Sequence, residues 1–216
     1  GRQTDDRSKT MNLFFDRLGV MKKLLGIIIL GLFLITPSQA DDIRDFQIEG
    51  MSVGDSLLNF LSESEIKQKK KTIYKNKKFS RVELPPSTLK VYDGSYIDFK
   101  TDDRNYEIKH IVGQLYYNNN IYNCYKKKDK IVNELKELFK NNVQIKDIPE
   151  HSHKFDKTGN SKIKKTHFIF NSGAVSQISC TDWSKKIEQD EGIKDSLKVT
   201  VATHEFVQWI RNEAYK

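Results

Sequence analysis

The segment from Gly50 to Leu57 contains residue types that could supply a nucleophile. Ser52 lies in the string GMSVG, which fits the Gly-x-Ser-x-Gly pattern of a serine exposed at a sharp strand-to-helix turn. Ser56 and Asp55 follow closely, and His204 lies near the C-terminus. Serine chemistry needs a histidine base and an acid that orients it, so these residues define one candidate hydrolytic site. The alternative is structural: Ser52 with Asp55 three residues later forms a capping box, which predicts helix caps at both positions.

A second candidate is a metal site in the segment 149–162. His151 and His153 alternate along the chain with Asp156 close behind. Alternate residues of an extended segment point to the same side, and two imidazoles with one carboxylate would leave an open coordination position. The segment is polar and reads as a loop, where solvated histidines are common. We therefore expect no metal and no cofactor.

Clusters of lysine form a third candidate, a surface that docks on anions. Such lysines are also typical of the solvated faces of helices and of protected sheet edges. The candidate docking residues are Lys70, Lys71, Lys77, Lys78, Lys126, Lys127 and Lys128.

The segment from Met21 to Ala40 has the pattern of a secretory signal peptide. Lys22 and Lys23 precede an uncharged apolar run, LLGIIILGLFLI, and Ser38-Gln-Ala40 offers small residues for a signal peptidase. The run is shorter than the roughly 20 residues of a membrane-spanning helix. We interpret 1–20 as upstream non-native translation, 21–40 as the signal peptide and 41–216 as a single mature domain. The prediction is a periplasmic or secreted protein with no transmembrane span after processing.

Net charge indicates the class of partner. The 216 residues carry 37 basic and 29 acidic side chains; six basic and three acidic ones lie in 1–40, which leaves a net charge of +5 on 41–216. Outside the cytoplasm such a protein meets anionic lipid headgroups or acidic polymers rather than nucleic acid. We expect an envelope partner or an anionic surface.

The two cysteines, Cys124 and Cys180, both fall in the mature part of the chain. Neither belongs to a Cys-x-x-Cys motif, and neither has a basic residue directly beside it. In an oxidising compartment we therefore expect a disulfide between them rather than reactive thiols.

Hydrophobic periodicity predicts an α+β domain. A period near two and turn residues indicate strands over 43–49, 79–84, 96–100, 106–117, 143–148, 165–170, 175–181 and 197–202. A period near 3.6 indicates helices starting at Ser52 and at Ser62, an amphipathic helix over 121–139 and a C-terminal helix capped by Thr203. Strands joined by hairpins with helices set apart imply an antiparallel sheet with helices packed on one side.

The string GDSL at 54–57 resembles the signature of the GDSL esterase and lipase family. The resemblance implies that Ser56 is the nucleophile. The family's C-terminal Asp-x-x-His pair has no match, because Val201 stands where the aspartate would precede His204, and its Gly-x-Asn-Asp block has no match either.

Two further resemblances concern exported proteins. The strings FQIEGMSVGDSLLNF (46–60), DWSKK (182–186) and EFVQWI (205–210) resemble a family of small exported proteins of unknown function from marine bacteria. The string IEGMS (48–52) is similar to the helix entry of SmpA/OmlA-type outer-membrane assembly lipoproteins. We therefore expect an exported, non-catalytic binding or envelope-accessory module, with a GDSL-like serine esterase as the alternative.

Overall fold

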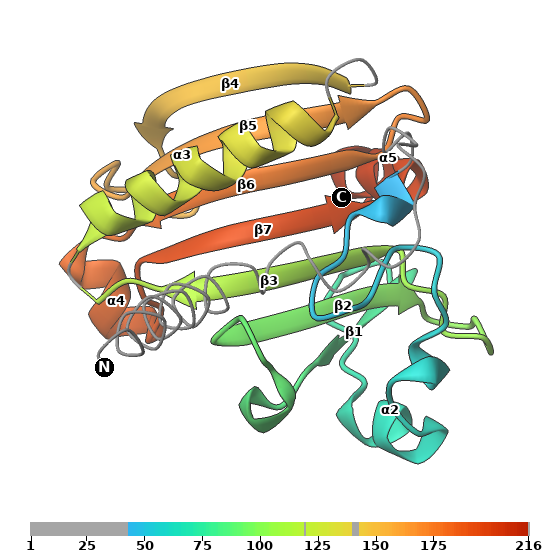
Figure 1. Cartoon of the computed structure of the whole chain (residues 1–216). Coiled ribbons are helices and arrows are strands. Elements are labelled where there is room, and N and C mark those ends of the chain that lie inside the picture. The colour runs from blue at the N-terminus through green and yellow to red at the C-terminus, as the bar shows by residue number, and fades with distance from the viewer. Residues whose placement is uncertain (1–42, 119, 140–142, 216) are drawn as a thin grey trace, which may run out of the picture. The chain divides into compact units, whose positions relative to one another are not determined.

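The computed structural model describes residues 43–118, 120–139 and 143–215 (Figure 1). The predicted signal peptide and the segment 1–20 lie outside these residues. Within them, no helix is long and apolar enough to cross a membrane.

Seven antiparallel strands form one sheet, which confirms the predicted α+β class. Their order across the sheet is β1-β2-β3-β7-β6-β5-β4, so that the last strand of the chain lies between β3 and β6 (Figure 1). The bounds are β1 Phe79–Glu83, β2 Gly94–Lys100, β3 His110–Tyr116, β4 Val143–Ser152, β5 Lys162–Phe170, β6 Val175–Asp182 and β7 Ser196–Ala202. Strand β4 reaches Ser152, past the predicted end at 148, and shifts register between Ile148 and His151.

Helices lie on both faces of the sheet, which corrects the prediction of helices on one side. Helix α3 (Ile121–Leu138) is bonded through Cys124 to Cys180 of β6. Helix α5 (His204–Asn212) packs on Val175 and Ala202. Residues 175 and 180 of β6 point to opposite faces because side chains alternate along a strand. Figure 1 shows α3 in front of the sheet and α5 behind it.

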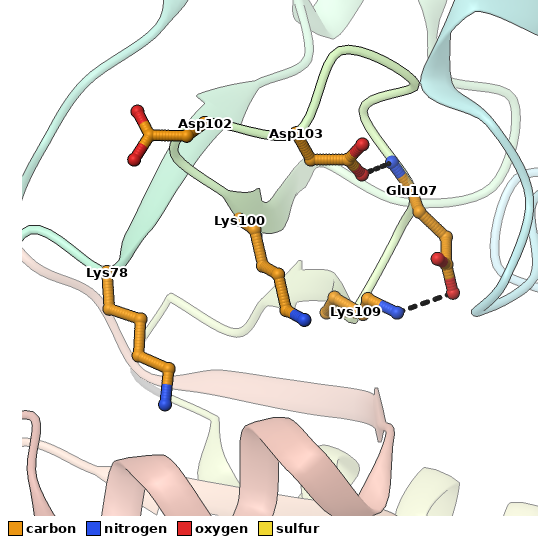
Figure 2. Close-up of a pocket in the computed structure, with 6 residues that line it drawn as sticks. All are labelled: Lys78, Lys100, Asp102, Asp103, Glu107 and Lys109. Atoms are coloured by element: carbon orange, nitrogen blue, oxygen red, sulfur yellow. Dashed lines mark hydrogen bonds and ion pairs between the residues drawn. The ribbon is translucent and has the colours of Figure 1, made fainter.

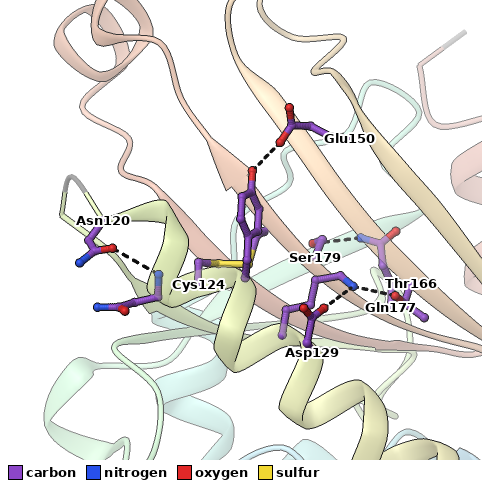
Figure 3. Close-up of a disulfide and its surroundings, with 11 residues drawn as sticks. Asn120, Cys124, Asp129, Glu150, Thr166, Gln177 and Ser179 are labelled. Atoms are coloured by element: carbon purple, nitrogen blue, oxygen red, sulfur yellow. Dashed lines mark hydrogen bonds and ion pairs between the residues drawn. A yellow bond between two sulfur atoms is a disulfide. The ribbon is translucent and has the colours of Figure 1, made fainter.

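The predicted disulfide is present between α3 and β6 (Figure 3). The Cα atoms of Cys124 and Cys180 are 6.0 Å apart, and 56 residues separate the cysteines along the chain. Both side chains are fully buried. Helix α3 begins at residue 121, as the periodicity predicts, and the Asn120 side chain caps it by accepting the backbone N–H of Asn123.

The segment before β1 differs most from the prediction. Residues 43–49 form no strand of the sheet; they contain a 3₁₀ turn, η1 (Ile43–Asp45), and one bridge between Ile48 and Met51. Ser52 does not cap a helix. Its hydroxyl donates to the Arg44 carbonyl, while the Asp55 carboxylate accepts its backbone N–H.

The next helical turn, η2 (Leu57–Asn59), has Ser56 at its N-cap. Helix α2 (Glu63–Lys69) has the predicted capping box of Ser62 and Glu65. The 3₁₀ turn η3 (Pro86–Thr88) and helix α4 (Lys185–Glu191) were not predicted; α4 ends at Gly192 in the left-handed conformation.

Candidate functional site

Three ionisable side chains lie in a row across the first three strands, on the sheet face that α5 covers in part. Arg81 of β1 is the register partner of Asp98 of β2, and Asp98 is the partner of His110 of β3. Register partners in a sheet project to the same face, so the three side chains are neighbours. Burial is deep, with Asp98 fully buried and the His110 side chain 10% exposed.

The carboxylate of Asp98 is bonded on both oxygens. Arg81 donates Nε to Oδ1 and Nη2 to Oδ2, each at 2.9 Å, and His110 Nδ1 lies 2.6 Å from Oδ2. Burial alone would raise the pKa of Asp98, but the His110 hydrogen bond and charge and the Arg81 guanidinium reverse the effect and hold that pKa below its usual value. Asp98 is therefore ionised, and Nδ1 of His110 carries the shared proton.

Aromatic rings hold the arginine and the histidine in place. The Arg81 guanidinium lies 3.7 Å from the centre of the Tyr96 ring and donates Nη2 to the Tyr74 hydroxyl at 2.8 Å. The His110 ring stacks on Phe206 of α5, with centroids 4.3 Å apart and planes 8° from parallel. Burial opposes the charge of Arg81, but the hydrogen bond to Asp98 and the charge of Asp98 together outweigh it, so that the pKa of Arg81 is raised and the cation persists.

A cavity of about 350 Å³ opens between this row and helix α5. Its volume is in the range typical of small-molecule sites. The charged and hydroxyl-bearing aromatic residues of its wall are Arg81, Arg211, His110, His167, Tyr74, Tyr96 and Tyr215. Apolar or neutral polar side chains complete the wall, and no described aspartate or glutamate lines it. We call it the α5 cavity.

The sheet floor of the α5 cavity has a second ordered row. His167 of β5 pairs in register with Gln177 of β6, and Gln177 pairs with Thr200 of β7. His167 Nε2 lies 2.8 Å from Gln177 Oε1. Burial is the largest influence and lowers the pKa of His167, whereas the Gln177 hydrogen bond acts in the opposite direction. The positive charges of Lys165, Arg211 and Lys146 lower it further, so that the net shift is downward. His167 is thus a neutral donor at physiological pH, surrounded by cations.

The arrangement provides groups that could bind and orient a ligand. Asp98 orients His110 in the manner of a catalytic acid–histidine pair. Among the described residues, however, no serine, threonine or cysteine is hydrogen-bonded to His110. The α5 cavity presents to a ligand an apolar and aromatic wall, the fixed guanidinium of Arg81 and the hydroxyl groups of tyrosines.

A larger surface cleft of about 480 Å³ is lined by Lys78, Lys100, Asp102, Asp103, Glu107 and Lys109 (Figure 2). Its lysines are already paired: Lys109 with Glu107 at 2.6 Å, Lys100 with Glu205 at 2.8 Å and Lys78 with Glu213 at 3.5 Å. Charges of both signs therefore neutralise one another within and around this cleft.

The residues of the predicted hydrolytic site are not brought together. The Ser56 hydroxyl donates to the Asn105 carbonyl at 2.6 Å and accepts the Leu58 N–H. Its hydrogen bonds therefore cap η2 and connect it to the segment at Asn105. Asp55 accepts the N–H of Ser52. His204 lies at the start of α5 against Gly173, where an added Cβ would overlap the histidine ring. Within the described part of the chain, no hydrogen bond joins Ser56 or Asp55 to a histidine.

The predicted metal-site residues have other partners. The Asp156 carboxylate accepts the backbone N–H groups of Thr158 and Ser161 and the hydroxyls of Thr158, Ser161 and Ser184. These bonds lower the pKa of Asp156. His153 packs against the Trp183 ring, and Nδ1 of His151 lies 2.9 Å from the Pro149 carbonyl. Across 43–118, 120–139 and 143–215, no three His, Cys, Asp or Glu side chains are placed to hold a metal.

The lysines predicted to dock on anions lie in different environments and do not form one surface. Lys70 donates to the Thr101 carbonyl, Lys71 pairs with Glu83, and Lys126 lies over the Tyr122 ring. Lys77 and Lys78 are exposed, and Lys127 is half-buried. Lys128 is 3% exposed and donates to Thr166 Oγ1 at 2.8 Å; Figure 3 labels Thr166 and Asp129, its two partners. Lys128 therefore cannot dock on a surface, because it faces the sheet.

The residues of the α5 cavity were not among the predicted site residues. His110 and His167 fall in the predicted strands 106–117 and 165–170, and Arg81 and Asp98 in the predicted strands 79–84 and 96–100. One signal was present: Asp98 stands between Ile97 and Phe99 in a strand, so a charge alternates with apolar residues and marks a polar sheet face. The pairing of Arg81 with Asp98 depends on strand register, which the sequence alone does not specify.

Nothing matches this chain in comparisons with models of known protein families, with curated proteins and with solved structures.

Proposed function

We propose that this protein is an exported, non-catalytic binding module that holds a small organic anion in the α5 cavity. The observation that carries the proposal is the composition of the cavity wall. It contains two arginines and two histidines beside aromatic and aliphatic side chains, and no described acidic residue. A ligand with an aromatic or aliphatic ring system or chain and one anionic group fits such a wall. Its apolar part can pack on the apolar side chains, and its anionic group can bind the cationic ones.

The fixed position of Arg81 supports binding rather than turnover. Its guanidinium is held by Asp98 and by the Tyr96 ring, and loses little freedom when a ligand arrives. Arg211 on α5 is exposed and provides a second cation at the rim of the same cavity. Ordered cations and a preformed apolar wall lower the cost of binding.

Location outside the cytoplasm is part of the proposal. The signal-peptide pattern of 21–40 and the Cys124–Cys180 disulfide support it, because disulfides persist in oxidising compartments. The full chain, expressed with a C-terminal tag in a bacterium with a periplasm, is expected in the periplasm or the medium with Asp41 as its first residue. Recovery of the uncleaved chain from the cytoplasm would overturn this part.

Binding is tested with a pair of naphthalene probes that differ in the sign of their charge. The protein is titrated with 2-naphthalenesulfonate, an aromatic anion, and with 2-(aminomethyl)naphthalene, a cation, by isothermal calorimetry. We expect the sulfonate to bind and the ammonium compound to bind at least tenfold more weakly, because the cavity wall is cationic. No sulfonate binding, or equal binding of both probes, would contradict the proposal.

A matched pair of arginine variants locates the site. Arg211→Gln removes a cation from the rim of the α5 cavity, whereas Arg104→Gln removes an exposed cation from the turn between β2 and β3. The first is expected to weaken sulfonate binding about fivefold to tenfold, and the second to leave it unchanged. Equal effects of the two substitutions would indicate non-specific charge attraction.

A further inference from the structure

A third row of the same sheet face lies beside the α5 cavity. Lys165 of β5 is the register partner of Ser179 of β6, and Ser179 is the partner of Lys198 of β7. Each lysine stands two residues along its strand from a cavity residue, Lys165 from His167 and Lys198 from Thr200. Residues two positions apart on a strand lie about 7 Å from each other, and their side chains point to the same face of the sheet. The two ammonium groups thus project beside the cavity floor.

Neither lysine has an anionic partner among the described residues. Lys71, Lys100 and Lys109 each have a carboxylate oxygen within 2.9 Å. In contrast, no ion pair or hydrogen bond joins Lys165 or Lys198 to a described side chain, although both are half-buried. A half-buried cation without a counterion is unfavourable for stability, and a ligand that supplies the anion would relieve that cost.

The surroundings of the two lysines strengthen the positive field. Burial lowers the pKa of Lys198, and the Arg81 charge lowers it further. Burial and the charge of Lys154 lower the pKa of Lys165. His153 belongs to the same sheet face by register, because His151, two residues before it, pairs with Ile163, two residues before Lys165. Burial and the charges of Lys198 and Lys165 lower the pKa of His153. Its ring packs on Trp183 with centroids 4.4 Å apart, which places an aromatic group beside the lysine row.

We propose that Lys165 and Lys198 form a second anion subsite, so that the ligand of the α5 cavity carries two anionic groups. The inference rests on the proposed function and narrows its ligand class to organic dianions. One anionic group meets the Arg81 side of the cavity, and the other meets the lysine row. The apolar body lies between them, against the cavity wall.

The test compares a rigid monoanion with a dianion built on the same ring system. The protein is titrated with 2-naphthalenesulfonate and with 2,6-naphthalenedisulfonate, whose charges lie on opposite rings. We expect the disulfonate to bind about tenfold more tightly, the gain typical of a charge-assisted hydrogen bond. If the monosulfonate binds and the disulfonate binds no more tightly, the second subsite is rejected while the proposed function stands. If neither binds, both are rejected.

Variants on β5 and β7 assign the gain to the lysine row. Lys165→Gln and Lys198→Gln should each remove most of the tenfold gain and leave monosulfonate binding within about twofold. Lys164→Gln is the matched control. Lys164 directly precedes Lys165 on β5, so its side chain points to the opposite face of the sheet, where it lies over the Tyr125 ring. Lys198→Arg keeps the charge and should keep the gain, which separates lost charge from disturbed folding. A gain that survives Lys165→Gln and Lys198→Gln, or disappears with Lys164→Gln, overturns the assignment.

Discussion

Asp98 and His110 face each other across β2 and β3, with 2.6 Å between Oδ2 and Nδ1. The carboxylate also accepts two hydrogen bonds from Arg81. One buried carboxylate therefore orients an arginine and a histidine on the sheet face that forms the α5 cavity. Removal of that anion should affect both the stability of the fold and the geometry of the cavity.

Asp98→Asn is expected to lower the free energy of unfolding by about 3–5 kcal/mol, the cost typical of leaving a buried charge without its partner. The variant keeps the shape of the side chain but leaves the half-buried Arg81 without a carboxylate. Urea denaturation at pH 7 measures the change. Asp102→Asn, at an exposed position of the following turn, should change stability by less than about 0.5 kcal/mol. Equal effects would show that the buried pair has no special role.

The pH dependence of the same pair follows from the lowered pKa of Asp98. A carboxyl group whose pKa is lower in the folded state stabilises the fold at pH values above its unfolded pKa, near 4. That contribution is lost as the pH falls through the lower, folded-state pKa. The stability advantage of the wild type over Asp98→Asn should therefore be constant from pH 7 to about pH 5 and shrink below pH 4. An advantage that grows on acidification would contradict the ionised assignment of Asp98.

Lys128→Met should leave the fold as stable as the wild type or stabilise it by about 1 kcal/mol at pH 7, because methionine needs no counterion in this buried position. Burial lowers the pKa of Lys128, so the wild type gains stability as the pH rises through the folded-state pKa towards the unfolded value. The difference between the two proteins should shrink between pH 7 and pH 10. Lys130→Met, an exposed substitution on the same helix, should show no such trend.

Loss of the disulfide should cost about 4 kcal/mol in the chain-entropy model, since the bridge spans 56 residues. Thermal denaturation with and without a reductant measures the loss. A Cys124→Ala, Cys180→Ala double variant should be destabilised to a similar degree and no longer respond to the reductant. A wild type indifferent to full reduction would show that packing of α3 on the sheet suffices.

Asp156→Ala should loosen the loop that joins β4 to β5, because the carboxylate accepts hydrogen bonds from Thr158, Ser161 and Ser184. Limited trypsin digestion measures the effect, with faster cleavage expected after Lys154 and Lys157. Asp190→Ala, on the exposed end of α4, is the control and should leave this cleavage unchanged. Unchanged cleavage in Asp156→Ala would mean that other contacts hold the loop.

Local signals in the sequence predicted three of the helix starts and the two strands on either side of the 171–173 turn. The Ser62 capping box, the Asn120 cap and the Thr203 cap each depend on residues within one helical turn. The 171–173 turn between β5 and β6 is equally local. The pattern failed at Ser52, where the hydroxyl bonds to Arg44 instead of starting a helix. It also could not place β7 between β3 and β6, because that pairing joins segments distant in sequence.

The position of β7 has a consequence for how the chain acquires its structure. The strands β1–β3 and β4–β6 are made first, and only β7, near the C-terminus, pairs with both groups. Neither group can join the other until β7 is in place, so the sheet is completed by the strand that is synthesised last of the seven. Pairing between segments so distant in sequence is slow compared with the local pairing inside each group, and it should couple the early and late parts of the chain in one late step of folding.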